Sequence, residues 1–159
     1  MIIRQPKFSE LPIVVQMGQM MHDEGAYSFV PYEVQDAYYS ARCALERHHD
    51  GEGQFIAVAE DSDGQIIGFM IAAMVPYIFS FKARYASDLA VYVIPEKRGT
   101  SAAIRLVKAF EEWADTQNAA EKKLGVSTAI NIERAHGFYT KLGYNQVGGL
   151  YTKRNGEAS

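Results

Sequence analysis

A change of hydrophobic period along the chain constrains its fold more than any other feature. Before Gln54 and after Ser101, apolar residues recur every three to four positions, a spacing that is typical of amphipathic helices. Between these points the apolar residues form runs bounded by turn residues, which predict strands over Gln54–Glu60, 65–75 and 83–94. Helices that precede and follow consecutive strands must bury their apolar faces, so the pattern predicts a sheet covered by helices.

The flanking segments supply the helices and some shorter strands. Ser9 suits an N-cap for a helix over residues 9–21, and a second helix follows Pro31 with an apolar stripe along one face. A third helix begins near Ser101, and a fourth covers residues 131–142. Shorter strands are predicted over residues 2–4, 124–128 and 146–153.

These elements follow the order β-α-α-β-β-β-α-β-α-β. The central strands can pair as antiparallel hairpins, whereas the later strand-helix-strand unit has to add a parallel pair. The sequence therefore predicts an α/β (α+β) fold with one mixed, twisted sheet and helices on both faces. We expect one domain over residues 1–154, because the chain contains no repeat, low-complexity tract or linker. Residues 155–159 have no large apolar side chain to bury and are expected to form a disordered tail.

The charge balance argues against nucleic-acid and membrane partners. The 159-residue chain has a net charge of −3 and a pI of about 5.8, so no overall basic field attracts a polyanion. An anionic ligand therefore has to be held by a local cluster of cations. The single Cys43 allows no internal disulfide, and the N-terminus shows no signal-peptide core, so we expect a cytoplasmic protein. The apolar run over residues 66–79 contains Pro76 and is too short to span a bilayer.

Residues 91–103 (VYVIPEKRGTSAA) combine a strand, a short cationic loop and a helix start made of small residues. The first N–H groups of a helix are unpaired and carry a partial positive charge, so they can bind a phosphate. Small side chains let a phosphate approach the backbone, and four nearby cations add charge: Lys97, Arg98, Arg105 and Lys108. Taken alone, the segment is also consistent with a plain strand-to-helix connection whose cations face solvent.

Two motifs in the C-terminal half resemble those of one enzyme family. In GNAT (general N-acetyltransferase) proteins, Val-x-Pro leads into Arg/Gln-x-x-Gly-x-Gly/Ala at a helix start, to which residues 91–103 are similar. Residues 135–144 (AHGFYTKLGY) resemble the Ala-x-x-Leu-Tyr-x-Lys-Leu-Gly-Phe segment of the same family. The motifs occur in the family's order and spacing, and the predicted element order is also the family's. The likeness is specific from Asp88 to Arg154 and looks most like GNAT proteins of bacteriophages and prophages.

The resemblance implies the GNAT acyl-CoA N-acyltransferase fold with acetyl-CoA as its cofactor. In the family, backbone groups of one strand pair with the pantetheine arm in a gap between two splayed parallel strands, and loop amides hold the pyrophosphate. The residues that the resemblance implies in cofactor binding are Val91, Val93, Lys97, Arg98, Gly99, Thr100, Ser101, Ala102, Ala103 and Asn131.

This sequence departs from the family's cofactor motif in two places. Ser101 and Ala103 occupy the glycine positions, and Gly99 lies two positions before the first of them. Helical residues need no positive φ, so Ser and Ala are allowed, but each adds a Cβ beside the phosphate. The family's Asn position falls on Ile132, one place after Asn131.

The resemblance further implies an N-acetyltransferase that moves the acetyl group to a primary amine by direct attack. Tyr139 corresponds to the tyrosine that lies near the thioester sulfur and protonates the departing thiolate. Its place in an apolar stripe is also consistent with a core tyrosine. Asp88 begins the strand that commonly carries the catalytic base in GNAT proteins. The family's Glu aligns nearer Ser87, so a bulge can decide which of the two residues faces the site.

The acceptor is predicted to be a small cationic amine held by acidic and aromatic side chains. His22, Glu24, Tyr27 and Tyr32 follow the first helix, where GNAT proteins commonly build the acceptor pocket. A carboxylate and aromatic faces suit an ammonium group, although His22 and Glu24 are equally consistent with a solvated turn. A protein lysine is a second class of acceptor that the sequence does not separate from the first, and a homodimer is left open.

The alternative to an enzyme is a non-catalytic GNAT-like regulator that binds CoA or another protein. The altered glycine positions and Ile132 favour this alternative, and release of thiol in the presence of amines separates the two. The sequence shows no zinc-ligand spacing, Walker loop or serine-centred elbow, so no metal is expected. The His48-His49-Asp50 cluster is interpreted as a solvated helix end near the C-terminal dipole.

Overall fold

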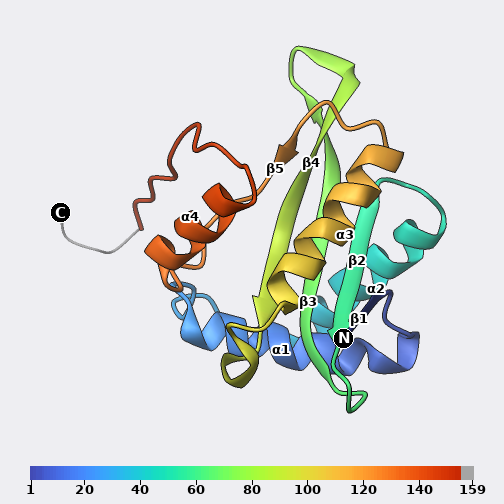
Figure 1. Cartoon of the computed structure of the whole chain (residues 1–159), viewed down its shortest axis with the longest axis vertical. Helices are drawn as coiled ribbons and strands as arrows, with labels where there is room; N and C mark the ends of the chain where they lie inside the picture. The colour runs from blue at the N-terminus through green and yellow to red at the C-terminus, as the bar shows by residue number, and fades with distance from the viewer. Residues whose placement is uncertain (155–159) are drawn as a thin grey trace.

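A five-stranded mixed sheet forms the centre of the molecule, with the strands in the order β1-β2-β3-β4-β5 (Figure 1). The computed structural model describes residues 1–154, so the predicted tail over 155–159 lies outside the described residues. The strands are β1 (Ile2–Arg4), β2 (Gln54–Glu60), β3 (Ile66–Tyr77), β4 (Ser80–Val93) and β5 (Lys122–Lys123). Neighbours from β1 to β4 pair antiparallel and β4 pairs with β5 in parallel, which confirms the predicted mixed sheet.

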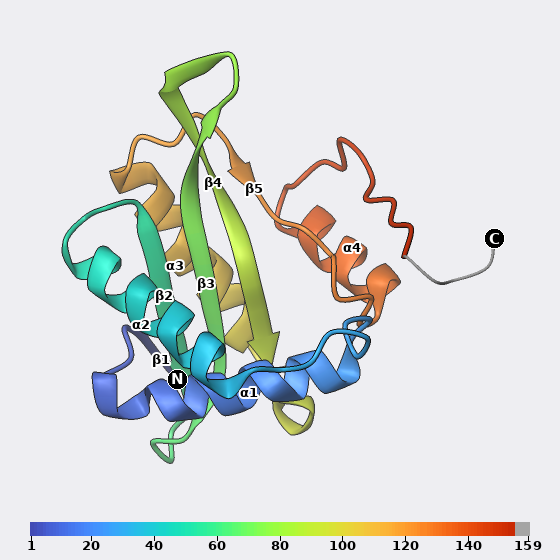
Figure 2. The ribbon, with the colours of Figure 1, turned by 180° about the vertical axis from the view of Figure 1, so that it is seen from behind.

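Four α-helices surround this sheet, and each overlaps a predicted helix. They are α1 (Leu11–Glu24), α2 (Val34–His49), α3 (Ala102–Thr116) and α4 (Ile132–Lys141). Short 3₁₀ turns at Phe8–Glu10 and Pro95–Lys97 precede α1 and follow β4. Seen from the two sides in Figures 1 and 2, α3 covers one face of the sheet, α1 and α2 cover the other, and α4 lies beyond the β5 edge.

Two apolar layers, one on each face of the sheet, hold these helices. On one face Phe110 of α3 is buried against Phe55 of β2. On the other face Leu11 of α1 and Leu45 of α2 pack in one cluster with Ile56, and all three are fully buried. Because helices cover both faces, every residue of β2 between its two ends is buried. This explains why the strand is a continuous apolar run rather than an alternating pattern.

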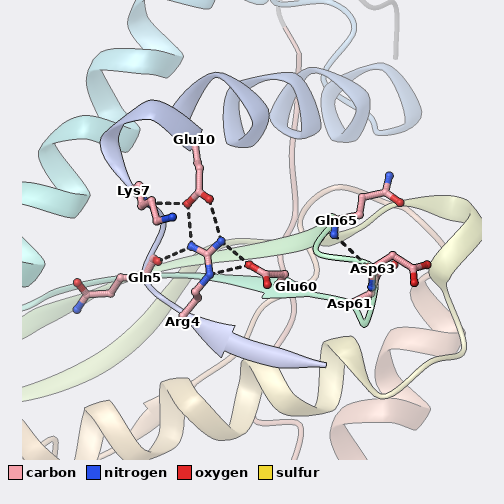
Figure 3. Close-up of polar contacts among 8 residues, drawn as sticks. All are labelled: Arg4, Gln5, Lys7, Glu10, Glu60, Asp61, Asp63 and Gln65. Carbon is pink, nitrogen blue, oxygen red and sulfur yellow. Dashed lines mark hydrogen bonds and ion pairs between the residues drawn. The ribbon is translucent and has the colours of Figure 1, made fainter.

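The start of α1 differs from the sequence-based prediction. Ser9 is not its N-cap, because Ser9 lies inside the 3₁₀ turn and Glu10 takes the cap position. The Arg4 guanidinium donates to Glu10 at 2.7 and 2.8 Å and to Glu60 at 2.8 Å, joining β1 and β2 to the helix start (Figure 3). These bonds from Arg4 lower the pKa of Glu10 to about 2. A long-range ion pair therefore places the helix start, which the local serine pattern does not show.

A β-bulge in β4 sets which residues face the cleft at the edge of the sheet. Asp88 pairs with Ala72 and Ala90 pairs with Ile71, so Leu89 is an extra residue without a partner on β3. An extra residue reverses the alternation of side chains along a strand. The β-bulge that the sequence allowed near Asp88 but did not establish is therefore present, and it lies directly after Asp88.

Two predicted strands are wrong. Only Lys122 and Lys123 pair with β4, and residues 124–128 have no strand structure. The chain leaves the sheet there because the Gly125 N–H donates to the Asp88 side chain, at 2.9 Å, instead of to a strand carbonyl.

Residues 146–153 are also without strand structure, and three of their large apolar side chains are exposed: Val147, Leu150 and Tyr151. The pair Gly148-Gly149 interrupts this segment and weakens any strand within it. The observed order is β-α-α-β-β-β-α-β-α, without the predicted final strand.

Candidate active site

A cleft opens where β4 loses its parallel neighbour. The pairing of β4 with β5 is limited to Ala86 with Lys122 and Ser87 with Lys123. Beyond these pairs the chain after β5 moves away from the sheet, and α4 stands apart from β4 (Figure 2). A cavity of about 620 Å³ occupies this gap. Its walls are residues 88–93 of β4, the loop before α3, the segment over residues 125–131, and one side of α4.

The loop between β4 and α3 presents unpaired backbone N–H groups. Gly99 has φ of 91°, a left-handed conformation that favours glycine, and it lines the cavity. Thr100 Oγ1 donates to the Lys97 carbonyl at 2.8 Å and fixes the turn. Within residues 1–154, the N–H groups of Gly99, Ser101 and Ala103 donate no hydrogen bond to another residue. A helix N-terminus with free N–H groups is suited to an anionic oxygen.

The predicted cofactor residues do not all reach this cavity. Those that line it are Val91, Val93, Lys97, Arg98, Gly99, Thr100, Ala103 and Asn131. Ser101 and Ala102 do not line it, and Ala102 is buried in the layer beneath α3. The Ser101 side chain donates to the Met1 sulfur instead, at 3.6 Å. Asn131 caps α4, because its side chain accepts from the Arg134 N–H at 3.3 Å.

The two adjacent cations of the loop join parts of the protein that are distant in sequence. Lys97 Nζ lies 2.8 Å from Asp61 Oδ2 in the β2–β3 turn, where Asp61 also accepts from the N–H groups of Asp63 and Gln65 (Figure 3). The hydrogen bond from Lys97 lowers the pKa of Asp61. The charges of Lys97 and Asp61 are therefore paired with each other within the protein.

Arg98 also forms an ion pair within the protein, with a residue at the end of α1. Its guanidinium donates to Glu24 at 2.7 Å and to the Val93 carbonyl at 3.0 Å, and it lies 5.3 Å above the Tyr92 ring. The Tyr92 hydroxyl donates to the same Glu24 carboxylate. Arg98 therefore ties the loop to α1 and β4.

Sequence reasoning missed a third cation, Arg134 of α4. It lines the cavity, and its guanidinium lies 3.8 Å from the place that a Cβ on Gly99 would occupy. No hydrogen bond or ion pair of the Arg134 side chain to another residue is present within residues 1–154. Arg134 directly precedes the Ala that opens the second motif, but only the structure shows α4 facing the loop.

Asp88 and Tyr139 both bond to the backbone of one residue, Gly125. Asp88 Oδ1 accepts from the Gly125 N–H at 2.9 Å, and the Tyr139 hydroxyl donates to the Gly125 carbonyl at 3.4 Å. Both side chains line the cavity, whereas Ser87 does not. Burial raises the pKa of Asp88 to about 6, and burial together with the Asp88 charge raises the pKa of Tyr139. The site thus pairs a carboxylate that titrates near neutrality with a tyrosine that stays protonated.

Tyr139 lines the cavity and belongs to neither of the two buried apolar layers. The helix α4 buries none of its residues, and Ile132, which belongs to the same stripe, is 46% exposed. Tyr139 instead faces a cavity in contact with solvent.

The structure adds Tyr144, which sequence reasoning did not single out. It takes the place of the Phe that ends the family motif, and its ring centroid lies 6.2 Å from that of Tyr139. Its hydroxyl is buried without a hydrogen-bond partner among the described residues. Burial and the nearby Glu111 carboxylate raise the pKa of Tyr144. Tyr144 lies behind Tyr139 and does not line the cavity.

Three of the four predicted acceptor residues hold the connection between α1 and α2. His22 Nε2 lies 2.7 Å from the Val30 carbonyl oxygen, and the Tyr32 hydroxyl donates to the Val15 carbonyl at 2.7 Å. Glu24 is held by Arg98 and Tyr92. None of these three side chains lines the cleft.

The fourth acceptor residue, Tyr27, lines a second cavity of about 550 Å³. This cavity lies between the α1–α2 connection and the C-terminal segment, and it shares Val126 and Ser127 with the first. The Ala26 N–H donates to the Thr128 carbonyl at 2.8 Å and Arg154 donates to the Ala26 carbonyl at 2.7 Å, which fixes both sides of the cavity.

No helix within residues 1–154 is long and apolar enough to cross a bilayer. In the same residues no three His, Cys, Asp or Glu side chains are grouped to hold a metal ion. His48 accepts a hydrogen bond from the Ile56 N–H at 3.2 Å, so the predicted solvated helix end is partly packed onto β2.

Comparisons with known proteins agree with this architecture. The model of the Acetyltransferase (GNAT) family matches residues 17–144, which is most of the chain. The protein named "Putative acetyltransferase from Agrobacterium tumefaciens str. C58" has a TM-score of 0.75 at 20% identity, covering 98% of this chain and 100% of that one. AAC(6')-Iy, solved with the bisubstrate analog CoA-S-monomethyl-acetylneamine, has a TM-score of 0.72 at 18% identity and 97% coverage of both chains. Ribosomal-protein-alanine N-acetyltransferase from Brucella melitensis biovar Abortus 2308 has a TM-score of 0.69 at 16% identity, covering 97% and 99%.

At these identities the structural likeness shows the fold alone. A comparison with curated proteins found no match. The resemblance to phage and prophage proteins is not tested by these findings and stays a prediction. The family match over residues 17–144 and the mixed sheet with its open β4 edge lead to the same assignment: the chain belongs to the GNAT family of acetyltransferases.

Proposed function

We propose that this protein is an acetyl-CoA-dependent N-acetyltransferase that transfers the acetyl group directly to a primary amine. One observation carries the proposal: a single cavity is lined both by a loop with free backbone N–H groups and by a carboxyl group and a tyrosine that bond to the same residue. The loop is centred on the left-handed Gly99, and the pair is Asp88 with Tyr139. This arrangement would allow one cavity both to bind a phosphate-bearing cofactor and to support proton transfer.

The residues of the cavity fit acetyl-CoA. The free N–H groups at Gly99 and Ala103 suit its pyrophosphate, and Arg134 adds a positive charge from α4. The unpaired edge of β4 suits the amide groups of the pantetheine arm, because it offers backbone hydrogen bonds that no strand takes. When bound, acetyl-CoA supplies an activated thioester, which makes direct acyl transfer possible without a metal.

The acid–base pair supplies the two proton transfers that the reaction needs. A charged amine is not a nucleophile, so Asp88 accepts a proton from the bound acceptor, directly or through water. The amine nitrogen would then form a bond to the acetyl carbon as the carbon–sulfur bond breaks. Tyr139 would donate its proton to the departing sulfur, and the second proton that the nitrogen loses as the amide forms would restore the Tyr139 hydroxyl. The N–H group and the carbonyl group of Gly125 hold the two side chains, so a single residue positions the acid and the base.

Release of free thiol tests this function. The protein with acetyl-CoA and a panel of primary amines and lysine peptides is expected to free CoA at a rate above that with acetyl-CoA alone. Formation of the thiol is followed by a colorimetric reagent, and mass spectrometry identifies the acetylated product. If calorimetry detects binding of acetyl-CoA while no amine or peptide releases thiol, the alternative of a non-catalytic CoA-binding regulator replaces this proposal.

The pH dependence of kcat/KM tests the role of Asp88. Because the pKa of Asp88 is raised to about 6, the carboxylate is protonated below that pH and cannot accept a proton. We expect kcat/KM to rise with pH on a limb centred near pH 6 and to continue rising as the amine itself deprotonates. Asp88→Asn keeps the shape, so it should remove the limb near pH 6 and lower kcat/KM by about 10²-fold, the lower end for general base catalysis. An unchanged limb in the mutant assigns it to another group.

A further inference from the structure

The second cavity is placed to hold the acceptor, given the function proposed above. It meets the first cavity at Val126 and Ser127, directly after Gly125, whose backbone bonds to Asp88 and Tyr139. Because the same two residues line both cavities, an acceptor in the second cavity can present its amine to the first cavity at Val126 and Ser127. The side chains that line this cavity therefore indicate the chemical class of the acceptor.

The chemistry of this cavity differs from that expected for a cationic amine. Its apolar part includes the aromatic rings of Tyr27 and Phe29 together with Leu150. Its charged residues are Lys153 and Arg154, and among the described residues no Asp or Glu lines it. Glu24, the carboxylate that sequence reasoning offered for the ammonium group, is ion-paired with Arg98 and lies outside both cavities. A polycationic acceptor would thus meet like charge there.

Lys153 and Arg154 have different parts in this cavity. The Arg154 guanidinium lies 4.2 Å above the Phe29 ring and donates to the Ala26 carbonyl, so it builds the wall. The exposed Lys153 ammonium makes no hydrogen bond or ion pair with another residue of 1–154. The hydroxyl groups of Ser127 and Thr152 line the same space. An ammonium beside hydroxyl groups is the set of donors that a carboxylate needs.

We propose that the acceptor is an amine that also carries a carboxylate and an apolar or aromatic group, as amino acids with large apolar side chains do. The carboxylate is held by Lys153 with the neighbouring hydroxyl groups, and the apolar group lies against Tyr27 and Phe29. The amine is then left to approach Val126 and Ser127. This proposal rests on the proposed function and replaces the sequence-based expectation of a cationic acceptor.

The test compares acceptors that differ only in charge. Phenylalanine and phenylalanine amide share the ring and the amine, and spermidine represents the cationic class. The wild-type protein should use phenylalanine with a higher kcat/KM than the amide, even though the amide has more of its amine neutral at a given pH. Spermidine should be the poorest of the three acceptors.

Variants of Lys153 decide whether this preference arises in the second cavity. Lys153→Met should lower kcat/KM for phenylalanine by about tenfold or more, as for loss of a charged hydrogen bond, and leave the amide unchanged. Lys153→Glu should lower it further and raise kcat/KM for spermidine. The matched control is Lys82→Met, which removes a lysine of β4 that lines neither cavity, and it should change nothing.

Failure of this proposal is distinguishable from failure of the proposed function. If spermidine is the best acceptor and the Lys153 variants match the wild type, the enzyme stands and the acceptor class is wrong. If Lys153→Met lowers kcat/KM equally for phenylalanine and for phenylalanine amide, the proposal that Lys153 binds the acceptor carboxylate is also overturned. If no acceptor releases thiol at all, the proposed function itself fails. Calorimetry with acetyl-CoA should give the same Kd for every Lys153 variant, because Lys153 is outside the first cavity.

Discussion

Tyr139→Phe is expected to lower kcat by about 10²- to 10⁴-fold, the usual contribution of a general acid, while the Kd for acetyl-CoA stays unchanged. The mutation removes only a hydroxyl whose single hydrogen bond, to the Gly125 carbonyl, is long at 3.4 Å. Because α4 buries none of its residues, this loss should have little effect on folding. Steady-state kinetics at saturating acetyl-CoA and acceptor measures kcat, and calorimetry measures the Kd.

The chain offers a matched control for this mutation in Tyr144→Phe. Tyr144 stands in the same motif, and its buried hydroxyl has no hydrogen-bond partner among the described residues and does not line the cavity. Its loss should therefore leave kcat within a few-fold of the wild type. Because the pKa of Tyr139 is raised, the wild type should also show no loss of activity between neutral pH and about pH 9 from this group. Wild-type turnover in Tyr139→Phe would remove the tyrosine from the mechanism.

Ala103→Glu should weaken acetyl-CoA binding by about 10³-fold. Ala103 lies in the first turn of α3, lines the cavity and has a free N–H group. A carboxylate there is a like charge beside the pyrophosphate, and two unit charges 4 Å apart interact by about 4 kcal/mol at an effective dielectric constant of about 20. A negative charge in the first turn favours the helix itself, so the folded state should persist.

Two measurements separate the effect of the added charge at position 103 on acetyl-CoA binding from the effect of the added side-chain volume. Ala103→Gln has nearly the same volume as the Glu variant and no charge, so it should lose clearly less affinity. Acetyl-CoA should raise the melting temperature of the wild type and of the Gln variant, but not of the Glu variant at the same concentration. An Ala103→Glu protein that binds acetyl-CoA as the wild type does would place the pyrophosphate away from the start of α3.

The sequence predicts β2 residue for residue, because its apolar run ends at turn residues and both of its faces are covered. It does not predict β5, whose two residues pair with β4 only because of where the chain returns after α3. Periodicity over residues 146–153 suggests a strand, but a strand also needs a neighbour, and none is available there. Local pattern therefore determines the elements that are buried on both faces, whereas elements at the edge depend on tertiary pairing.

The candidate site shows the same contrast between features that follow from local sequence and features that depend on tertiary contacts. The loop between β4 and α3 and Tyr139 are predictable as cavity-lining elements because each belongs to a contiguous motif. The partners of the loop cations are not, since Asp61 is 36 residues from Lys97 and Glu24 is 74 residues from Arg98. Arg134 was missed for the related reason that α4 meets the loop only in three dimensions.

The sharing of Val126 and Ser127 by the two cavities has a consequence for ligand design. Two cavities that meet at the same residues can be filled at once by one molecule with two joined halves. Once the first half is bound, the second half is held at an effective concentration on the order of millimolar for a short flexible linker. Even two fragments of modest affinity would then combine into a tight bivalent inhibitor. The length of the linker would report how far apart the two binding positions lie.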